Sequence, residues 1–150
     1  MATANAATNY LERRILDFLF KNNSLSFSSP GDSIYVGLAT AVSAAETGSL
    51  TEATFGGYGR KRVNHADWTL TSESDNTQTC KNTNAIEFNE STGTDNTISH
   101  VFIATDETAS LDVVGSGGNV LFIGKLDANK VISTGDIFRI NALNLTIEMK

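Results

Sequence analysis

Three side chains in this sequence could together bind a transition metal: His65, His100 and the only cysteine, Cys80. Zinc takes three or four nitrogen, sulfur or oxygen ligands from a protein, so all three side chains would have to meet across the fold. The simpler interpretation places His65 at the surface after a strand and His100 at the start of a buried strand, where it hydrogen-bonds locally. We prefer it, and predict neither a metal nor another cofactor.

Either histidine would also suit a Ser-His-Asp triad, whose members need not be adjacent in the sequence. The chain has no Gly-x-Ser-x-Gly segment that would present a nucleophilic serine on a sharp turn. A hydrolase is therefore the weakest function considered. We predict that the protein is not an enzyme and has no catalytic residues.

Three loop-like segments contain residue types that bind ions in other proteins. Gly115 to Gly118 is rich in glycine, but it lacks the lysine of a phosphate-binding loop and precedes a strand, not a helix. Glu73 to Asn76 and Asp106-Glu107 lack the spaced carboxylates and the glycine of an EF-hand loop. We interpret the first segment as a turn and the other two as solvated surface.

The most specific segment is Phe55 to Val63, a glycine-rich turn leading into an expected strand with three consecutive cations. On a strand, Arg60 and Arg62 point to one face and Lys61 to the other. Such charges protect edge strands from unwanted pairing. They also suit a docking patch, in which Arg60 or Arg62 meets a carboxylate of a neighbouring subunit. The sequence leaves both interpretations open.

Tyr58 and Trp68 are the aromatic candidates for a binding site. Their rings could stack on a sugar face, with the loops rich in Ser, Thr and Asn supplying hydrogen bonds. An aromatic side chain on a strand more often fills the core. A glycan-stacking site at these two residues is therefore kept as an alternative.

One helix is expected, over residues 9–22, after a loose arm at residues 1–8. Asn9 is the expected cap, with Glu12 three residues later as in a capping box. An ion pair between Asp17 and Lys21 is also expected on its polar side. The apolar residues recur at helical spacing: Leu11, Ile15, Phe18 and Leu19, with Leu16 beside them. Phe20 lies off this stripe, so Phe20 and Leu16 are candidate contacts with a neighbouring subunit.

Everything after the turn at Pro30 is typical of β-structure, with a small-residue loop at Ala41 to Thr54. The polar segment Ser72 to Asn84 is expected to be a long loop or a solvated hairpin. The last strand is expected to alternate between an apolar face, Leu143 to Met149, and a wet face. We predict one domain over residues 1–150, with an antiparallel β-sandwich of Greek-key or jelly-roll type at 33–150. The expected strands are Ile34 to Thr40, Tyr58 to Val63, Asp67 to Thr71, Ala85 to Phe88, Ile98 to Ala104, Asn119 to Leu126, Val131-Ile132 and Ile137 to Ile140.

Composition limits the functional classes. The 150 residues have a formal net charge of -6, which argues against a nucleic-acid-binding surface. The longest apolar runs are far too short to cross a bilayer as a helix, so no membrane association is expected. A single cysteine excludes an intrachain disulfide and fits synthesis in a reducing cytoplasm. Met1 to Asn5 has no basic region before an apolar run, so no secretory signal is expected.

Taken in order, several of these segments resemble the small proteins of tailed bacteriophages known as phage tail fibre proteins. The resemblance covers nearly the whole chain, although Ser72 to Asn84 is more polar and Asn89 replaces a proline common in that family. It implies a virion component more directly than a fibre, because a fibre would show extended repeats or coiled coil. The matching segments are Leu11 to Phe20, Tyr35 to Thr40, Gly56 to Arg60, Ile98 to Val101, Gly117 to Leu126 and Gly135 to Ile140.

The leading hypothesis is therefore a virion structural protein, made in the host cytoplasm and displayed on the particle exterior. A capsid decoration and a tail or tail-fibre component both fit the sequence. We expect a closed homo-oligomer, with a trimer as our specific prediction, and contacts with other virion proteins. The alternative is a receptor- or carbohydrate-binding module that recognises a host surface glycan.

Overall fold

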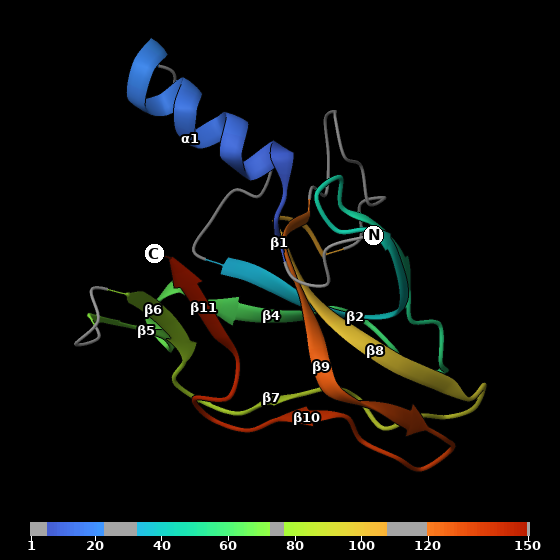
Figure 1. Ribbon diagram of the computed structural model, residues 1–150. Coiled ribbons are helices and arrows are strands. Elements are labelled where there is room, and N and C mark those ends of the chain that lie inside the picture. The colour runs from blue at the N-terminus through green and yellow to red at the C-terminus, as the bar shows by residue number, and fades with distance from the viewer. Residues whose placement is uncertain (1–5, 23–32, 73–76, 108–119, 150) are drawn as a thin grey trace.

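Figure 1 shows the computed structural model, which describes residues 6–22, 33–72, 77–107 and 120–149. It confirms the predicted class, because antiparallel sheets make up most of the described chain and one helix lies near the N-terminus. The predicted turn at Gly115 to Gly118, the acidic segment Glu73 to Asn76 and residues 1–5 of the predicted arm lie outside the described residues. No helix in the described ranges has both the length and the apolar character that a membrane crossing needs.

The helix, α1 (Asn9–Lys21), is capped by Thr8 and not by Asn9 as predicted. Thr8 Oγ1 accepts a hydrogen bond from the Leu11 N–H at 3.4 Å and donates one to the Val120 carbonyl at 2.6 Å. The preceding strand β1 (Ala6–Ala7) pairs with β9 (Val120–Ile132), so these two residues are not part of a loose arm. Thr8 is the cap because its side chain and the preceding strand are bound to β9, which is more than a hundred residues away in the sequence. Such a distant contact cannot be recognised from the residues around Thr8.

The largest sheet has six strands in the order β1-β9-β8-β2-β3, and β4 also pairs with β2. All its pairs are antiparallel. Its remaining strands are β2 (Ser33–Ala44), β3 (Ser49–Glu52), β4 (Lys61–Asn64) and β8 (Asn96–Ala104).

Two smaller antiparallel sheets complete the described fold. One has the order β11-β6-β5, and the other pairs β10 with β7. A 3-10 turn, His65–Asp67, connects β4 to β5. The strands are β5 (Trp68–Ser72), β6 (Gln78–Asn82), β7 (Ile86–Glu87), β10 (Arg139–Ile140) and β11 (Thr146–Met149).

The core lies on both faces of the six-stranded sheet, because alternate residues of β2 point to opposite sides. Val36 and Leu38 belong to a buried cluster that joins the sheet to β7 and β10, which form a second layer (Figure 1). On the opposite face, Ala39 packs in a second cluster with Phe102. Gly37 lies against the Phe102 ring, where a Cβ atom would be only 2.7 Å from Cε2.

Several predicted boundaries were wrong. The two strands predicted at Asn119 to Leu126 and Val131-Ile132 are one continuous strand, β9. The segment Ala41 to Thr54 is not a loop, because β2 continues to Ala44 and β3 pairs back on it. In the polar segment Ser72 to Asn84 the structure agrees with a hairpin and not with a long loop, because β6 pairs antiparallel with β5 and, on its other side, with β11. β3 and β6 consist mostly of small and polar residues, so the sequence shows little of the apolar alternation by which a strand is recognised.

The last strand starts at Thr146, later than predicted, although Leu143 continues the apolar alternation. Leu143 adopts a left-handed backbone with φ 65° and is exposed. The buried Asn82 fixes this segment. Its carbonyl accepts from the Leu143 N–H at 2.8 Å, its Oδ1 accepts from the Leu145 N–H at 2.8 Å, and its Nδ2 donates to the Asn141 carbonyl at 2.9 Å.

Candidate functional site

The glycine-rich turn in Phe55 to Val63 packs against a neighbouring loop. Gly56 N–H donates to the Gly93 carbonyl at 2.7 Å, and Thr92 N–H donates back to the Gly56 carbonyl at 2.9 Å. Gly57 has φ +85°, and a Cβ atom there would lie 2.8 Å from the Glu90 carbonyl oxygen. Glycine is required at Gly57 both by the backbone conformation and by the close approach. The predicted strand after this turn begins only at Lys61.

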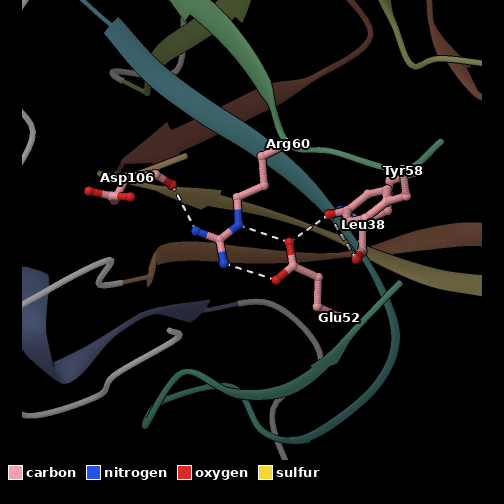
Figure 2. A network of polar contacts seen from close by, with 5 residues as sticks. All are labelled: Leu38, Glu52, Tyr58, Arg60 and Asp106. Carbon is pink, nitrogen blue, oxygen red and sulfur yellow. Dashed lines mark hydrogen bonds and ion pairs between the residues drawn. The ribbon is translucent and has the colours of Figure 1, made fainter. Parts of the chain in front are cut away.

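Between this turn and β4, Tyr58 and Arg60 converge on Glu52 of β3, as Figure 2 shows. Arg60 donates from Nε to Glu52 Oε1 at 2.8 Å and from Nη2 to Oε2 at 2.9 Å, so the ion pair is bidentate. Its Nη1 donates to the Asp106 carbonyl at 2.8 Å. Tyr58 donates its hydroxyl to Glu52 Oε1 at 2.8 Å and accepts the Leu38 N–H at 3.0 Å. The network ties β2, β3 and the end of β8 together.

Electrostatics agree with this inward arrangement. Burial raises the pKa of Tyr58 far above its ordinary value, so the phenol stays protonated and donates. Burial also opposes the charge on Arg60, but its hydrogen bonds and ion pair with Glu52 outweigh that cost and raise the pKa of the guanidinium. The guanidinium carbon lies 5.5 Å from the centroid of the Phe102 ring, within the range of a cation–π contact.

The three consecutive cations therefore have different surroundings. Arg60 is buried and meets a carboxylate of its own chain, not of a neighbouring subunit. Lys61 is half-buried, and its Nζ donates to Asn89 Oδ1 at 2.6 Å. Arg62 is exposed on β4, opposite Tyr35. Arg60 does not share a strand face with Arg62 as predicted, because β4 starts after Arg60.

Both aromatic candidates for glycan stacking contribute to packing. The Tyr58 ring lies edge-on to Phe55 at 5.3 Å and stacks on Phe88 at 6.2 Å between centroids. Trp68 is half-buried against two apolar clusters, and its buried Nε1–H has no acceptor. No described contact at either ring favours sugar binding.

The residues considered for metal and catalytic chemistry do not converge. The described residues contain no group of three or more His, Cys, Asp or Glu side chains that could hold a metal ion. His65 is exposed in the 3-10 turn, and Cys80 lies on β6. His100 Nδ1 lies 2.7 Å from Ser99 Oγ, but Ser99 also donates to the Thr40 carbonyl at 3.0 Å. Directly across from His100 is Lys125, not a carboxylate that would orient a catalytic imidazole.

The other candidate site is the outer part of α1, which extends away from the sheets in Figure 1. Only Leu11 is buried, and Ile15 is half-buried against the same cluster on β8 and β9. Beyond them, four large apolar side chains are exposed: Leu16 at 56%, Phe18 at 49%, Leu19 at 63% and Phe20 at 79%.

Helical geometry places these exposed side chains around half of the circumference. Successive residues are about 100° apart, so Phe18 and Phe20 differ by about 200°. Leu16 and Phe20 lie on the side opposite to Leu11, so the sheets that Leu11 contacts do not reach them. On the polar side of the helix, Asp17 forms an ion pair with Lys21 at 3.7 Å, as predicted, and another with Arg13 at 4.0 Å.

Sequence reasoning found Leu16 and Phe20 but missed Glu52. Nothing near Glu52 marks it, because it sits in a segment predicted as a loop and its partners follow by six and eight residues.

A family model described as Podophage GP4 fiber I protein gp80 matches residues 6–148. The match therefore includes α1, the Glu52 network and every strand of the described fold up to Glu148 in β11. No curated protein matches the chain.

Proposed function

The chain belongs to the podophage GP4 fiber I protein gp80 family, and we propose on this basis that it is a tail-fibre-type component that assembles through α1. Membership confirms the resemblance to phage tail fibre proteins and makes the chain a structural component of the virion, assembled in the host. A fibre family also supports contacts with other virion proteins and a non-enzymatic role.

The exposed apolar face of α1 carries the assembly proposal. Monomeric proteins rarely leave large apolar side chains clustered on one element, and such patches mark interaction sites. A helix that is apolar over a wide arc is usually covered on more than one side. Within the described residues, the sheets cover the helix at Tyr10, Leu11 and Ile15, so neighbouring molecules are the natural cover for the exposed Leu16, Leu19 and Phe20.

We further propose that the neighbours are copies of the same chain, in a trimer. Of the apolar arc of about 200°, the part around Leu11 and Ile15 faces the sheets of the chain itself, and the part from Leu19 to Phe20, about 100° wide, is left for neighbours. In a three-fold arrangement each helix contacts two others through a heterologous interface that closes into a ring. The two sides of the arc, Phe18–Leu19 and Leu16–Phe20, would then face different neighbours.

A second contact is proposed at Lys61 and Arg62. Both lie on β4, and Arg62 is exposed there, so a carboxylate of another virion protein would meet its guanidinium at the surface of the chain. The buried Arg60 is left out of this docking patch, because its bidentate partner is Glu52.

The proposed role is tested by the copy number of the protein in purified particles, measured by quantitative mass spectrometry against the major capsid protein. A fibre-type component gives a small number of copies that is a multiple of three. Several hundred copies would support a capsid decoration in place of a fibre. Absence from purified particles would contradict the virion role itself.

A further inference from the structure

The outer edge of β5 has no strand partner within the described ranges, since β5 ends its three-stranded sheet. Asp67 precedes β5 and Thr83 follows β6, and the Thr83 N–H donates to the Asp67 carbonyl at 2.8 Å. These two residues are therefore a hydrogen-bonded pair that continues the ladder between β5 and β6 by one step. Hydrogen-bonded and non-hydrogen-bonded pairs alternate along an antiparallel ladder. The backbone groups of Trp68, Leu70 and Ser72 therefore point away from β6, toward this outer edge.

The edge of β5 also lacks the usual protection against pairing. Natural edge strands use charges, proline or bulges to prevent association. In the largest sheet, β1 pairs with β9 only at Phe122 and Ile123. The rest of β9 has Lys125, Asp127 and Lys130, and its register with β8 shifts between Lys125 and Lys130. β5 has no charge, no proline and no register shift against β6, and its central Leu70 is 81% exposed.

We propose that β5 pairs antiparallel with β5 of a second copy, around a two-fold axis through Leu70. The strand Trp68–Ser72 is centred on Leu70, with Thr69 and Thr71 on either side. In this register Leu70 faces Leu70 of the second copy, and each Thr69 faces a Thr71. Thr–Thr and apolar cross-strand pairs stabilise antiparallel sheets. The arrangement adds about six backbone hydrogen bonds and joins the two sheets into one.

The apolar row across the sheet supports this register. Leu70 lies directly opposite Cys80, and Cys80 lies directly opposite Ile147. Opposed residues share one face of a sheet, so the row Ile147, Cys80, Leu70 would continue into its copy across the axis. The opposite edge strand, β11, carries Glu148 and lacks this symmetry.

This contact is separate from α1 and does not depend on it. Five residues per strand bury less surface than the roughly 800 Å² per partner of a stable interface. The pairing is therefore expected to be weak between free molecules and to strengthen where the particle holds copies close together.

Cysteine cross-linking tests both the contact and its register. In a Cys80→Ser background, Leu70→Cys places two thiols on opposed residues whose Cα atoms are about 5.5 Å apart, within the range for a disulfide. In the proposed register, the new thiol of the Thr69→Cys variant faces an unchanged Thr71 of the second copy, and that of the Thr71→Cys variant faces an unchanged Thr69. Neither variant alone therefore forms a disulfide between its two copies. A mixture of these two variants does cross-link. Val131→Cys, at a site with 63% exposure on β9, is the matched control.

We expect Leu70→Cys to form the disulfide dimer at least tenfold faster than Val131→Cys, with the Thr69/Thr71 mixture also above that control. Because all these positions are exposed, folding is retained and is checked by circular dichroism. Equal rates at Leu70 and Val131 would overturn the proposal. Cross-linking of Leu70→Cys in particles to a different virion protein would assign the edge to that protein and would likewise overturn it.

Discussion

Glu52 is the residue on which the position of Arg60 depends, because it accepts both the bidentate guanidinium and the Tyr58 hydroxyl. Replacing Arg60 with Met leaves the Glu52 carboxylate without its cation in a partly buried position. Breaking such a pair by removing one partner costs roughly 3 kcal/mol. We predict a loss of about this size in the free energy of unfolding, measured by urea denaturation.

The double variant Glu52→Gln/Arg60→Met separates this explanation from a simple loss of packing. With both charges removed, no carboxylate is left unpaired, so the double variant should be more stable than Arg60→Met alone. Arg62→Met, on the exposed neighbouring position, is the control and should change stability little. A double variant less stable than the single one would contradict the role given to Glu52.

His100 provides a second prediction, on pH dependence. Burial and the nearby charge of Lys125 lower the pKa of His100 below its ordinary value. The unfolded chain therefore takes up this proton first as the pH falls, so the contribution of His100 to stability is lost below about pH 6.5. In Lys125→Met the pKa of His100, followed by NMR titration, should rise toward the ordinary value. An unchanged or lower pKa in that variant would contradict the assigned cause.

At the scale of elements, the exposed face of α1 gives the most direct prediction about assembly. Leu16→Ser and Phe20→Ser change exposed positions opposite Leu11, so they leave the contacts of the helix with its own chain intact. We predict that the double variant shifts the mass in solution from a trimer to a monomer, measured by light scattering. Leu143→Ser, at an exposed position on another element, should keep the wild-type mass. A monomeric wild-type protein would contradict assembly through α1.

β6 and β11 depend on Asn82, which is fully buried and fully hydrogen-bonded. Asn82→Ala removes one accepted and two donated hydrogen bonds, so the Leu145 N–H and the carbonyls of Asn84 and Asn141 lose this partner. Each such group costs roughly 1–3 kcal/mol. We predict a loss in that range or larger by urea denaturation, whereas Asn129→Ala on the exposed part of β9 should be nearly neutral. Similar effects for both variants would contradict this account of the C-terminal strand.

Elements with strong local periodicity could be predicted from the sequence, and elements fixed by distant partners could not. The helix and the apolar strands around Val36 and Val101 follow from their spacing. β3 and β6 are built from polar and small residues, and they exist because β2 and β5 offer them a ladder. The candidate site divides in the same way: Leu16 and Phe20 were identifiable from the helical wheel, but the inward direction of Arg60 depends on Glu52.

At the scale of the whole molecule, the chain combines a packed β-body with a helix that is only half covered. In the body, the buried charge of Arg60 is paired with Glu52 of the same chain, so this region is stable without a contact from another molecule. In the described structure, the large apolar side chains of the outer half of α1 remain exposed to solvent. In our proposal, α1 therefore has the assembly function and the sheets form the body of the protein.

The most direct test is incorporation into particles of a phage that lacks its own copy of the gene. The Leu16→Ser/Phe20→Ser chain and a Val131→Ser control chain are each supplied in trans, and their amounts in purified particles are measured by quantitative mass spectrometry. Our account predicts wild-type incorporation of the control and at least tenfold less of the helix variant, with both chains folded and equally abundant in the lysate. Equal incorporation of the two chains would contradict assembly through α1.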